Sequence, residues 1–458
     1  MAAGGTPDDG GRTPLRTVVG GLTTRGRSFL AAGAAAAVCA YVLGQSDLLR
    51  IGLLLVALPV ICVAVLHGTR HRVVADRRLT PSRVPAGSEA RVHLTLNNVS
   101  RLPTGLLMLQ DQVPYVLGPR PRFVLDRVAP GARREVSYRV RSDLRGRYPL
   151  GPLELRLGDP FGMCETVRSF SGRDTLVVIP RTEPLPPLRL AGEASGYGEG
   201  RQRSLALAGE DDVLPRGYRH GDDLRRVHWR STARYGELMV RREEQPQRAR
   251  CTVLLDTRFG AYRGAGPDSA FEWAVSGAAS ALVHLLERGF AVRLVTDDGE
   301  CVPGEGSDGF AGSTQESAHS TGLLLDALAT VEHSDGTGLA PAHDVLRGGD
   351  EGLLLAFLGD LDEEQLAVAA AMRRRSGTAV AFVLDGAAWA PDALSLLTPA
   401  PAPAVPYEDR LRLLREAGWA VVPVAPGAVL AELWQQAGQP AGPPPARSGG
   451  GAFEGSRS

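Results

Sequence analysis

The chain has 458 residues, 43% of them hydrophobic, and its 51 basic side chains balance 51 acidic ones. This length suggests two or three domains of about 150 residues each. A net charge of zero argues against a general nucleic-acid binder, which needs a basic face to displace counterions from phosphates. All 51 basic residues are arginines, a bias typical of a GC-rich bacterial genome. The chain therefore lacks the lysine of a Walker A phosphate loop and of any Schiff-base mechanism.

Five cysteines are present, and their pattern fits neither a zinc knuckle nor a disulfide framework. The count is odd and no two of them have the CxxC spacing. We therefore expect a reducing compartment and no resident cofactor. The cysteines are Cys39, Cys62, Cys164, Cys251 and Cys301.

Two uncharged apolar runs lie close together near the N-terminus. Phe29 to Gln45 would span roughly 25 Å as a helix, just short of a hydrocarbon core about 30 Å thick. Ile51 to Leu66 is the second run, and its Pro59 is tolerated better in a membrane helix than in a soluble one. The short connection predicts a transmembrane hairpin over residues 29–66.

An alternative is a cleaved signal peptide, because Arg25 and Arg27 precede the first run, with the second run as a stop-transfer segment. In the hairpin, several arginines flank the two runs, whereas the connection between the runs contains only Arg50. Because positively charged residues stay on the cytoplasmic side, both soluble ends are expected in the cytoplasm. We expect a multi-pass cell-membrane protein in contact with lipid. The flanking arginines are Arg12, Arg16, Arg25, Arg27, Arg70, Arg72, Arg77 and Arg78.

Residues 73–180 have the sequence pattern of a β domain. Short apolar or alternating segments such as Ala90–Leu96, Glu135–Val140 and Leu176–Ile179 are separated by Pro and Gly. Asp159-Pro160-Phe161-Gly162 reads as a turn. Several short strands at this spacing predict an antiparallel β-sandwich of immunoglobulin-like type.

After about Cys251 the pattern alternates between apolar strands and amphipathic helices. This alternation predicts a parallel sheet with helices on both faces. The segments at 299–316 and 335–352 are rich in Gly and Ser and are expected to be long loops. The expected strands are 251–256, 290–296, 353–359, 379–384 and 420–424, and the expected helices are 269–288, 321–331, 362–375, 407–417 and 428–436.

Together these patterns predict six segments along the chain. They are a cytosolic tail at 1–28, the transmembrane hairpin at 29–66, the β-sandwich at 73–180, a linker and signature segment at 181–247, the α/β domain at 248–437 and a disordered tail at 438–458.

The stretch from Gly209 to Glu244 is unusually rich in charge and aromatic residues for a linker. A hydrolase would use Asp222, Asp223 and His228 as an acid–base or metal cluster. A structural role would instead pair Arg216, Arg225 and Arg234 with Asp222 and Asp223, and pack Trp229 against the sheet. In that case Arg216 and Asp222 stabilise the junction between the β and α/β domains.

The same stretch resembles the signature of the bacterial domain-of-unknown-function 58 family. Val227 stands where the family has Ile, and the resemblance extends over residues of about 29–436. It implies a von Willebrand factor A-like domain after the signature and a MoxR-type AAA+ ATPase as partner. The resemblance is carried by Ala233 and by the seven residues that we take as a partner-docking set: Arg216, Tyr218, Gly221, Asp222, Arg225, Trp229 and Arg234.

Metal-binding von Willebrand-type domains carry D-x-S-x-S after the first strand, with a Thr and a second Asp from later loops. Here the sequence is Asp256-Thr257-Arg258-Phe259-Gly260, so Arg258 and Gly260 replace the two hydroxyls. Asp360 matches the second acid, and Thr321 is a loose candidate for the Thr. Mg²⁺ needs oxygen ligands, and a guanidinium competes for the same carboxylates. We expect that Asp256 and Asp360 hold no tight ion.

Four aspartates follow expected strands: Asp256, Asp297, Asp360 and Asp385. Ligands of open α/β sheets bind at this edge, although Asp after a strand also caps the next helix. We expect a non-enzymatic adaptor that presents this rim and the signature to the ATPase. The alternatives are an envelope-associated hydrolase built on Asp222, Asp223 and His228, and a structural membrane scaffold.

Overall fold

The protein is described here by a computed structural model, and its chain divides into two compact units, Met1–Arg181 and Thr182–Ser458. Most of the expected N-terminal tail and linker, and nearly all of the C-terminal tail, lie outside the described residues. The described residues are 21–70, 73–101, 103–159, 161–187, 215–218, 227, 229–241, 249–304, 310–311, 317–347, 351–389 and 405–438.

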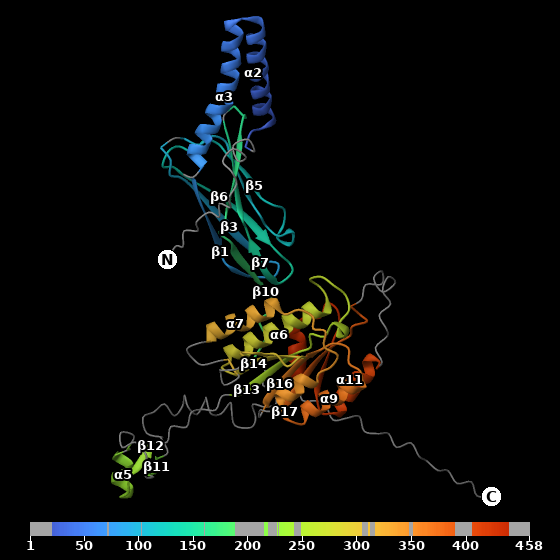
Figure 1. The fold of residues 1–458 in the computed structure, drawn as a ribbon. Coiled ribbons are helices and arrows are strands. Elements are labelled where there is room, and N and C mark those ends of the chain that lie inside the picture. Colours follow the sequence, from blue (N-terminus) through green and yellow to red (C-terminus); the bar gives the residue numbers. More distant parts are fainter. Residues whose placement is uncertain are drawn as a thin grey trace, which may run out of the picture. The chain divides into compact units, whose positions relative to one another are not determined.

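The first unit begins with two helices, α2 (Thr24–Leu43) and α3 (Ser46–Arg70) (Figure 1). Thr23 caps α2 by accepting a hydrogen bond from the Gly26 N–H, and Gly44 ends it with a φ of 64°. This left-handed residue lets the chain reverse within two positions. Pro59 lies inside α3 without ending it.

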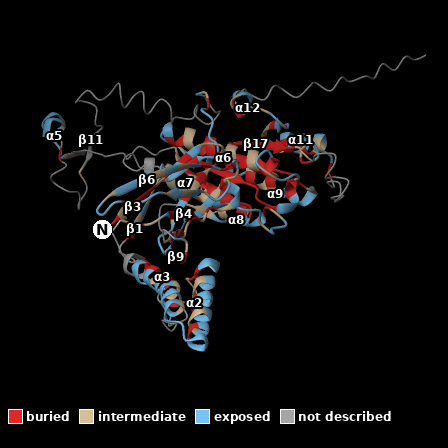
Figure 2. Cartoon of the chain, turned by 90° about the horizontal axis from the view of Figure 1, so that it is seen from above, coloured by how far each residue is buried: buried red, intermediate tan, exposed pale blue. Residues whose placement is uncertain are grey.

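Both helices are long and apolar enough to cross a membrane. They pack against each other through glycines, because a Cβ on Gly33 would lie 2.9 Å from the Gly52 carbonyl oxygen and 2.7 Å from a Val56 methyl carbon. Small residues of this kind let membrane helices approach closely. Much of their remaining surface is exposed (Figure 2), and many of the exposed side chains are large and apolar.

The rest of the first unit consists of strands in three sheets, with orders β1-β3-β6, β5-β4-β8-β9 and β2-β10-β7. β2 pairs in parallel with β10, whereas the other described pairings of this unit are antiparallel. The strands are β1 (Val73–Thr80), β2 (Arg83–Pro85), β3 (Glu89–Asn98), β4 (Leu107–Asp111), β5 (Arg122–Leu125), β6 (Arg133–Arg141), β7 (Gly146–Leu150), β8 (Leu153–Gly158), β9 (Glu165–Phe170) and β10 (Asp174–Ile179), with the 3-10 turn η1 (Tyr115–Leu117) between β4 and β5.

The three sheets share one hydrophobic core. Along β8, Leu153, Leu155 and Leu157 are buried while the residues between them are partly exposed, as the two-residue period of a strand dictates. The core also includes Leu94 of β3 and Leu176 of β10. The strands expected around residues 90–96, 135–140 and 176–179 are confirmed, and they extend by one or two residues except at Ile179, where the end is as expected.

The expected turn at Asp159–Gly162 joins the β region to the start of α2. Asp159 accepts hydrogen bonds from the Phe161 and Cys164 N–H groups, and Gly162 has a φ of 68°. The Thr23 hydroxyl donates to the Gly162 carbonyl at 2.6 Å. Burial, the Asp159 charge and neighbouring Cys62 raise the pKa of Cys164 to about 12, so this thiol is a poor nucleophile.

A buried arginine connects several strands of the β region. Arg77 of β1 donates from Nε and Nη2 to the two carboxylate oxygens of Asp111 at 3.0 and 2.6 Å. Tyr138 of β6 donates its hydroxyl to the same carboxylate at 2.6 Å. Burial and this hydrogen bond raise the pKa of Tyr138, which keeps the phenol a neutral donor.

The second unit is built on a six-stranded, mainly parallel sheet of order β15-β14-β13-β16-β17-β18. Only β15, at the edge, runs antiparallel to its neighbour. The strands are β13 (Arg250–Leu255), β14 (Ala291–Thr296), β15 (Cys301–Val302), β16 (Glu351–Leu358), β17 (Ser376–Leu384) and β18 (Ala420–Val424). The helices are α6 (Ala270–Glu287), α7 (Ser317–Thr330), α8 (Ala340–Leu346), α9 (Glu363–Arg373), α11 (Tyr407–Glu416) and α12 (Leu430–Ala437), and the 3-10 turn η4 (Phe259–Ala261) follows β13.

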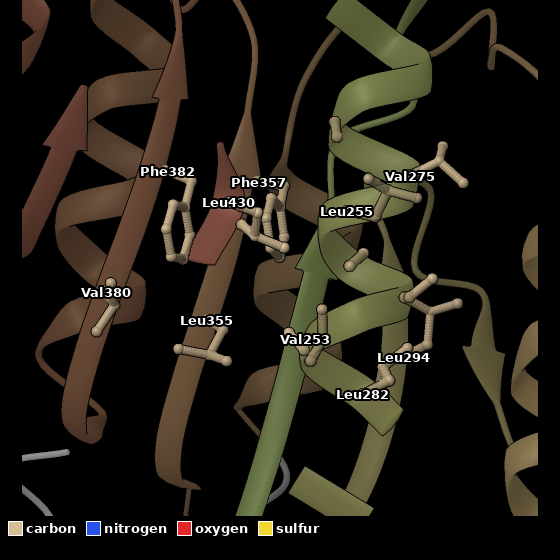
Figure 3. Packing of buried hydrophobic residues seen from close by; sticks show 14 of the residues in the cluster. Val253, Leu255, Val275, Leu282, Leu294, Leu355, Phe357, Val380, Phe382 and Leu430 are labelled. Carbon is tan, nitrogen blue, oxygen red and sulfur yellow. The ribbon is translucent and has the colours of Figure 1, made fainter. Parts of the chain in front are cut away.

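Helices cover both faces of this sheet, as the alternation of strands and helices predicts. Alternate residues of β16 point to opposite faces: Phe357 packs with α6, α7 and α12, and Ala356 packs with α8, α9 and α11. Figure 3 shows part of the first cluster, in which the rings of Phe357 and Phe382 stack with centroids 4.9 Å apart. Burial on both faces explains why these strands are continuously apolar.

The two expected long loops need correction. The segment 299–316 contains the short edge strand β15, and the segment 335–352 contains α8 and the start of β16. Leu339, Ala342 and Leu346 are buried at helical spacing. With only seven residues and Gly-rich flanks, α8 is stabilised by this packing rather than by its own propensity.

We predict that breaking the Arg77–Asp111 pair destabilises the β region strongly. Arg77→Met leaves the Asp111 carboxylate buried without a counter-charge, which costs roughly 3–5 kcal/mol of unfolding free energy. The exposed pair of Arg139 (64% exposed) and Glu89, 3.2 Å apart, is the control, and Arg139→Met should cost less than about 1 kcal/mol. Urea unfolding of the detergent-solubilised chain measures both, and equal losses would contradict the argument.

Candidate functional site

Four aspartates gather at the carboxyl edge of the parallel sheet. Asp256 follows β13, Asp297 follows β14, Asp360 follows β16 and Asp385 follows β17. These strands are parallel neighbours in the order β14-β13-β16-β17, so the topology brings their ends to one edge. We call Asp256, Asp297, Asp360 and Asp385, with the loops that carry them, the acidic rim.

Asp256 is fully buried and forms an ion pair inside its own loop. Arg258 donates from Nε to Asp256 Oδ1 at 2.9 Å and from Nη2 to Oδ2 at 2.7 Å. The same Nη2 donates to the Asp360 carbonyl at 3.1 Å, and the Gly359 N–H donates to Asp256 Oδ2 at 3.2 Å. The guanidinium therefore ties the end of β13 to the end of β16.

Burial raises the pKa of Asp256, and Arg258 acts against this shift. Burial alone would lower the pKa of Arg258, but the Asp256 carboxylate raises it overall. The first shift favours a neutral acid and the second a charged arginine. We assign an ion pair, because two parallel N–H···O bonds below 3 Å are typical of a guanidinium with a carboxylate.

Asp360 is held by a second arginine from a distant helix. Arg410 of α11, 1% exposed, donates from Nη1 to Asp360 Oδ1 at 2.6 Å. Arg263 lies farther away, with its Nε 3.8 Å from Asp360 Oδ2. Gly386 lies so close that a Cβ there would be 2.7 Å from Asp360 Oδ2. Asp360 is thus enclosed by arginines and backbone.

The other two aspartates make different contacts. Asp297 Oδ1 accepts from the Thr257 N–H at 2.7 Å and from the Thr257 hydroxyl at 2.5 Å, and Oδ2 accepts from the Ser334 hydroxyl at 2.6 Å. Asp385 is partly exposed and accepts from the Ala387 N–H at 3.1 Å, which closes a turn. Asp385 therefore stabilises a local turn directly after β17.

The residues at the rim do not fit a Mg²⁺ site. Both candidate ligands, Asp256 and Asp360, already bind guanidinium groups, and the two hydroxyl positions of the motif hold Arg258 and Gly260. Among the residues that the structure describes, no group of three or more His, Cys, Asp or Glu side chains could hold a metal ion. What the arrangement can do is compensate the charges of Asp256 and Asp360 and fix the rim loops in place.

Sequence reasoning missed three residues of the rim. Arg410 is 50 residues from Asp360 and lies on a helix whose pattern does not distinguish it from a surface arginine. Ser334 supplies the hydroxyl for Asp297, whereas the suggested Thr321 lies within α7. Tyr262 donates to the Asp256 carbonyl at 2.8 Å, and burial raises the pKa of Tyr262, which keeps it a donor.

The signature segment is described only in part. β11 (Pro215–Gly217) pairs antiparallel with β12 (Met239–Arg241), and α5 (Trp229–Tyr235) lies between them in sequence. The Tyr218 N–H donates to the Leu238 carbonyl at 2.8 Å, and the Met239 N–H donates to the Thr232 hydroxyl at 3.0 Å. The first bond continues the β11–β12 pairing, and the second connects β12 with the middle of α5.

Within this segment Val227 is buried, Ala233 and Arg234 are exposed, and Trp229 is 72% exposed. The expected packing of Trp229 against the sheet stays a prediction. Arg216 lies in β11, but its side chain is not described. The positions of Gly221, Asp222, Asp223, Arg225 and His228 lie outside the described residues, so the proposed Arg216–Asp222 pair and the hydrolase cluster both stay predictions.

Comparison with known families identifies the same part of the chain. Residues 215–373, from β11 to the end of α9, match the family described as "Protein of unknown function DUF58". This match supports the DUF58 family. A relative from Bacillus subtilis (strain 168), the uncharacterized protein YeaD, is 26% identical over 236 residues and supports it as well. The alignment covers 48% of this chain and 55% of YeaD, so the two are matched over only about half their lengths. The DUF58 match includes Asp256, Asp297 and Asp360 but ends before Asp385 and Arg410.

Solved structures give only weak similarity. The CARDB domain of a Pyrococcus furiosus protein is 11% identical, with a TM-score of 0.18, over 23% of this chain and 87% of that one. The sporulation control protein Spo0M from Bacillus subtilis is 12% identical, with a TM-score of 0.15, over 23% of this chain and 49% of that one. Similarity at this level assigns neither a fold nor a function.

We predict that Arg258 is what keeps divalent ions from the rim. Two unit positive charges about 4 Å apart repel by about 4 kcal/mol at an effective dielectric of about 20, and the double charge of Mg²⁺ increases this. The wild-type chain should bind neither Mg²⁺ nor Mn²⁺ tightly in calorimetric titration. Arg258→Ser should bind either ion and gain thermal stability from it, and a further Asp256→Ala should remove this binding.

The matched control is Arg412→Ser, which removes an arginine whose side chain is 63% exposed on α11. It should behave as the wild type does. Tight Mg²⁺ binding by the wild-type chain that is lost on Asp256→Ala would show that the rim is a metal site despite Arg258.

Proposed function

We propose that this chain is a membrane-anchored interaction protein without catalytic activity, which presents its acidic rim and signature segment to a MoxR-type AAA+ ATPase. The apolar helices α2 and α3 support the membrane anchor. The DUF58 match supports the family resemblance, and this resemblance implies the MoxR-type ATPase as partner.

The observation that carries the proposal is that the buried carboxylates of the rim are paired with arginines while an aromatic ring beside them is exposed. Asp256 and Asp360 use their oxygens on arginines, which leaves them poorly suited to acid–base work. Phe259, directly after Arg258, is 71% exposed. Its N–H donates to the Ser334 carbonyl at 2.9 Å, so a rigid loop holds the ring outward. Exposed aromatic residues are enriched where proteins bind one another.

Two finer assignments belong to this proposal. We propose that the α/β unit is von Willebrand factor A-like, which its mainly parallel sheet, two-sided helix cover and acids at the strand ends support. We also propose that the β region is an immunoglobulin-like sandwich, which its short paired strands and shared core support.

Capture of the ATPase tests the function. The full-length chain in nanodiscs should retain a MoxR-type ATPase from the same genome, with or without nucleotide. Phe259→Asp and Trp229→Ala should each reduce capture at least tenfold while the melting temperature is unchanged, because both rings are exposed. Tyr115→Asp, at a 95% exposed tyrosine of the β region, is the control and should have no effect.

Failure of capture in every nucleotide state would contradict the adaptor. Two further results would point to its rivals. Turnover of an envelope precursor that His228→Ala abolishes in a folded protein would favour the hydrolase. Self-crosslinking in the membrane without any ATPase would favour the scaffold.

We propose further that both soluble ends of the hairpin lie in the cytoplasm, on the evidence of the flanking arginines. Native Cys164 is unsuited to a labelling test because it is buried and its pKa is raised. Cysteines introduced at exposed Gln45, between the helices, and Ser171, between β9 and β10, should differ: a membrane-impermeant maleimide applied to intact cells should label Gln45→Cys only, in a background without Cys39. Labelling of Ser171→Cys would reverse the topology.

A further inference from the structure

A basic cavity lies at the opposite end of the α/β sheet from the acidic rim. It has a volume of about 590 Å³ and is lined by His343, Arg347, Ala371, Arg374 and Arg375. Cavities that hold small ligands commonly measure 300–1,000 Å³. We call this feature the arginine cavity.

The arginine cavity is formed where two neighbouring helices end. His343 lies in α8 and Arg347 is its C-cap, whereas Ala371 lies in α9 and Arg374 is the C-cap of that helix. Arg375 directly precedes β17. The amino ends of parallel strands and the carboxyl ends of the preceding helices meet here, so the fold itself brings the basic side chains together.

Arginines at the carboxyl ends of helices can have a purely structural role, because their charge complements the helix dipole. Arg373 has that role: it donates from Nη1 to the Ser376 carbonyl and from Nε to the Gly418 carbonyl, both at 2.7 Å. In the described part of the chain, the side chains of Arg374 and Arg375 form no such bond and no ion pair. The dipole therefore does not explain why these two guanidinium groups border a cavity.

The charge around the cavity is not balanced by described carboxylates. Asp344 lies 3.5 Å from Arg347 Nη1 and 3.8 Å from His343 Nδ1, and its side chain is 69% exposed. Three arginines thus face one carboxylate. All three arginines are exposed to solvent, so an anion can reach them directly.

We propose that the arginine cavity binds a ligand that carries two or more phosphate groups. A guanidinium matches the oxygens of phosphate with two parallel N–H bonds, and several are available here. Four of the five lining residues carry basic or imidazole side chains and only Ala371 is an apolar residue, so recognition rests on the phosphates. The volume of the cavity exceeds what one phosphate fills. The ligand is either a soluble polyphosphate compound or an anionic phospholipid headgroup.

Calorimetric titration of the full-length chain with inorganic tripolyphosphate tests the site. The chain is placed in phosphatidylcholine nanodiscs in metal-free buffer and should bind the probe. The variant R347Q/R374Q/R375Q should bind at least tenfold more weakly. The control R101Q/R120Q/R127Q removes the same charge from exposed arginines of the β region and should bind as the wild type does.

Further arms identify the chemistry and the source of the phosphate. R374K/R375K keeps the charge but not the paired donors, and it should bind several-fold more weakly than the wild type. Nanodiscs containing cardiolipin, whose headgroup carries two phosphates, indicate a lipid headgroup if they weaken tripolyphosphate binding only when the three arginines are present. Unchanged binding in these nanodiscs indicates a soluble ligand, and either result supports the site.

Three results would overturn the proposal. The control variant could lose binding as fully as R347Q/R374Q/R375Q, which would reduce the effect to overall charge. Citrate could bind as tightly as tripolyphosphate, or R374K/R375K as tightly as the wild type, which would remove the preference for phosphate. Finally, the wild-type chain could show no binding at millimolar tripolyphosphate, which would show that these arginines do not form an anion site.

Discussion

The pairing of buried carboxylates with arginine is the interaction on which both units of this chain depend. Arg77 holds Asp111 in the β region, and Arg258 holds Asp256 in the α/β unit. A buried carboxylate without a partner is costly, and a paired one is stable only when its hydrogen bonds are complete. Because every basic residue is an arginine, both pairs use planar guanidinium groups with two parallel donors. This geometry fixes direction as well as charge, so each pair aligns the strands that it joins.

The sequence predicted much of the fold because several signals agreed at the same positions. Ser269 before α6 and Gly289 after it mark the ends of a helix, and both functions are seen: Ser269 accepts from the Glu272 N–H, and Gly289 has a φ of 84°. Asp362 and Gln365 form a reciprocal capping box at the start of α9. Strands such as β13 are apolar on both faces, which indicated a sheet covered on both sides. Local chemistry determines each of these features, and local chemistry can be read from a sequence.

The candidate site was predicted only in part, for a physical reason. The aspartates could be predicted because each one follows an apolar strand. The expected effect of Arg258 on metal binding could be predicted because Arg258 lies only two residues after Asp256. The contact between Arg410 and Asp360 joins residues that are 50 apart, and nothing in α11 distinguishes this arginine from its exposed neighbour Arg412. Short α8 was missed because tertiary packing, not its own sequence, stabilises it. Non-local contacts of this kind depend on how helices pack, and no periodic pattern encodes them.

The Arg258–Asp256 ion pair makes the charge and shape of the loop after β13 independent of metal ions. A metal ion is exchangeable, so a surface built around one changes its charge and shape when the concentration of free divalent ions changes. Arg258 is covalently part of the same loop as Asp256, and its charge does not vary with magnesium supply or with physiological pH. A surface organised in this way is always assembled, and chelators or ion fluxes give the cell no means of switching it. Under the proposed function, control over docking at this loop therefore cannot act through a metal ion bound there.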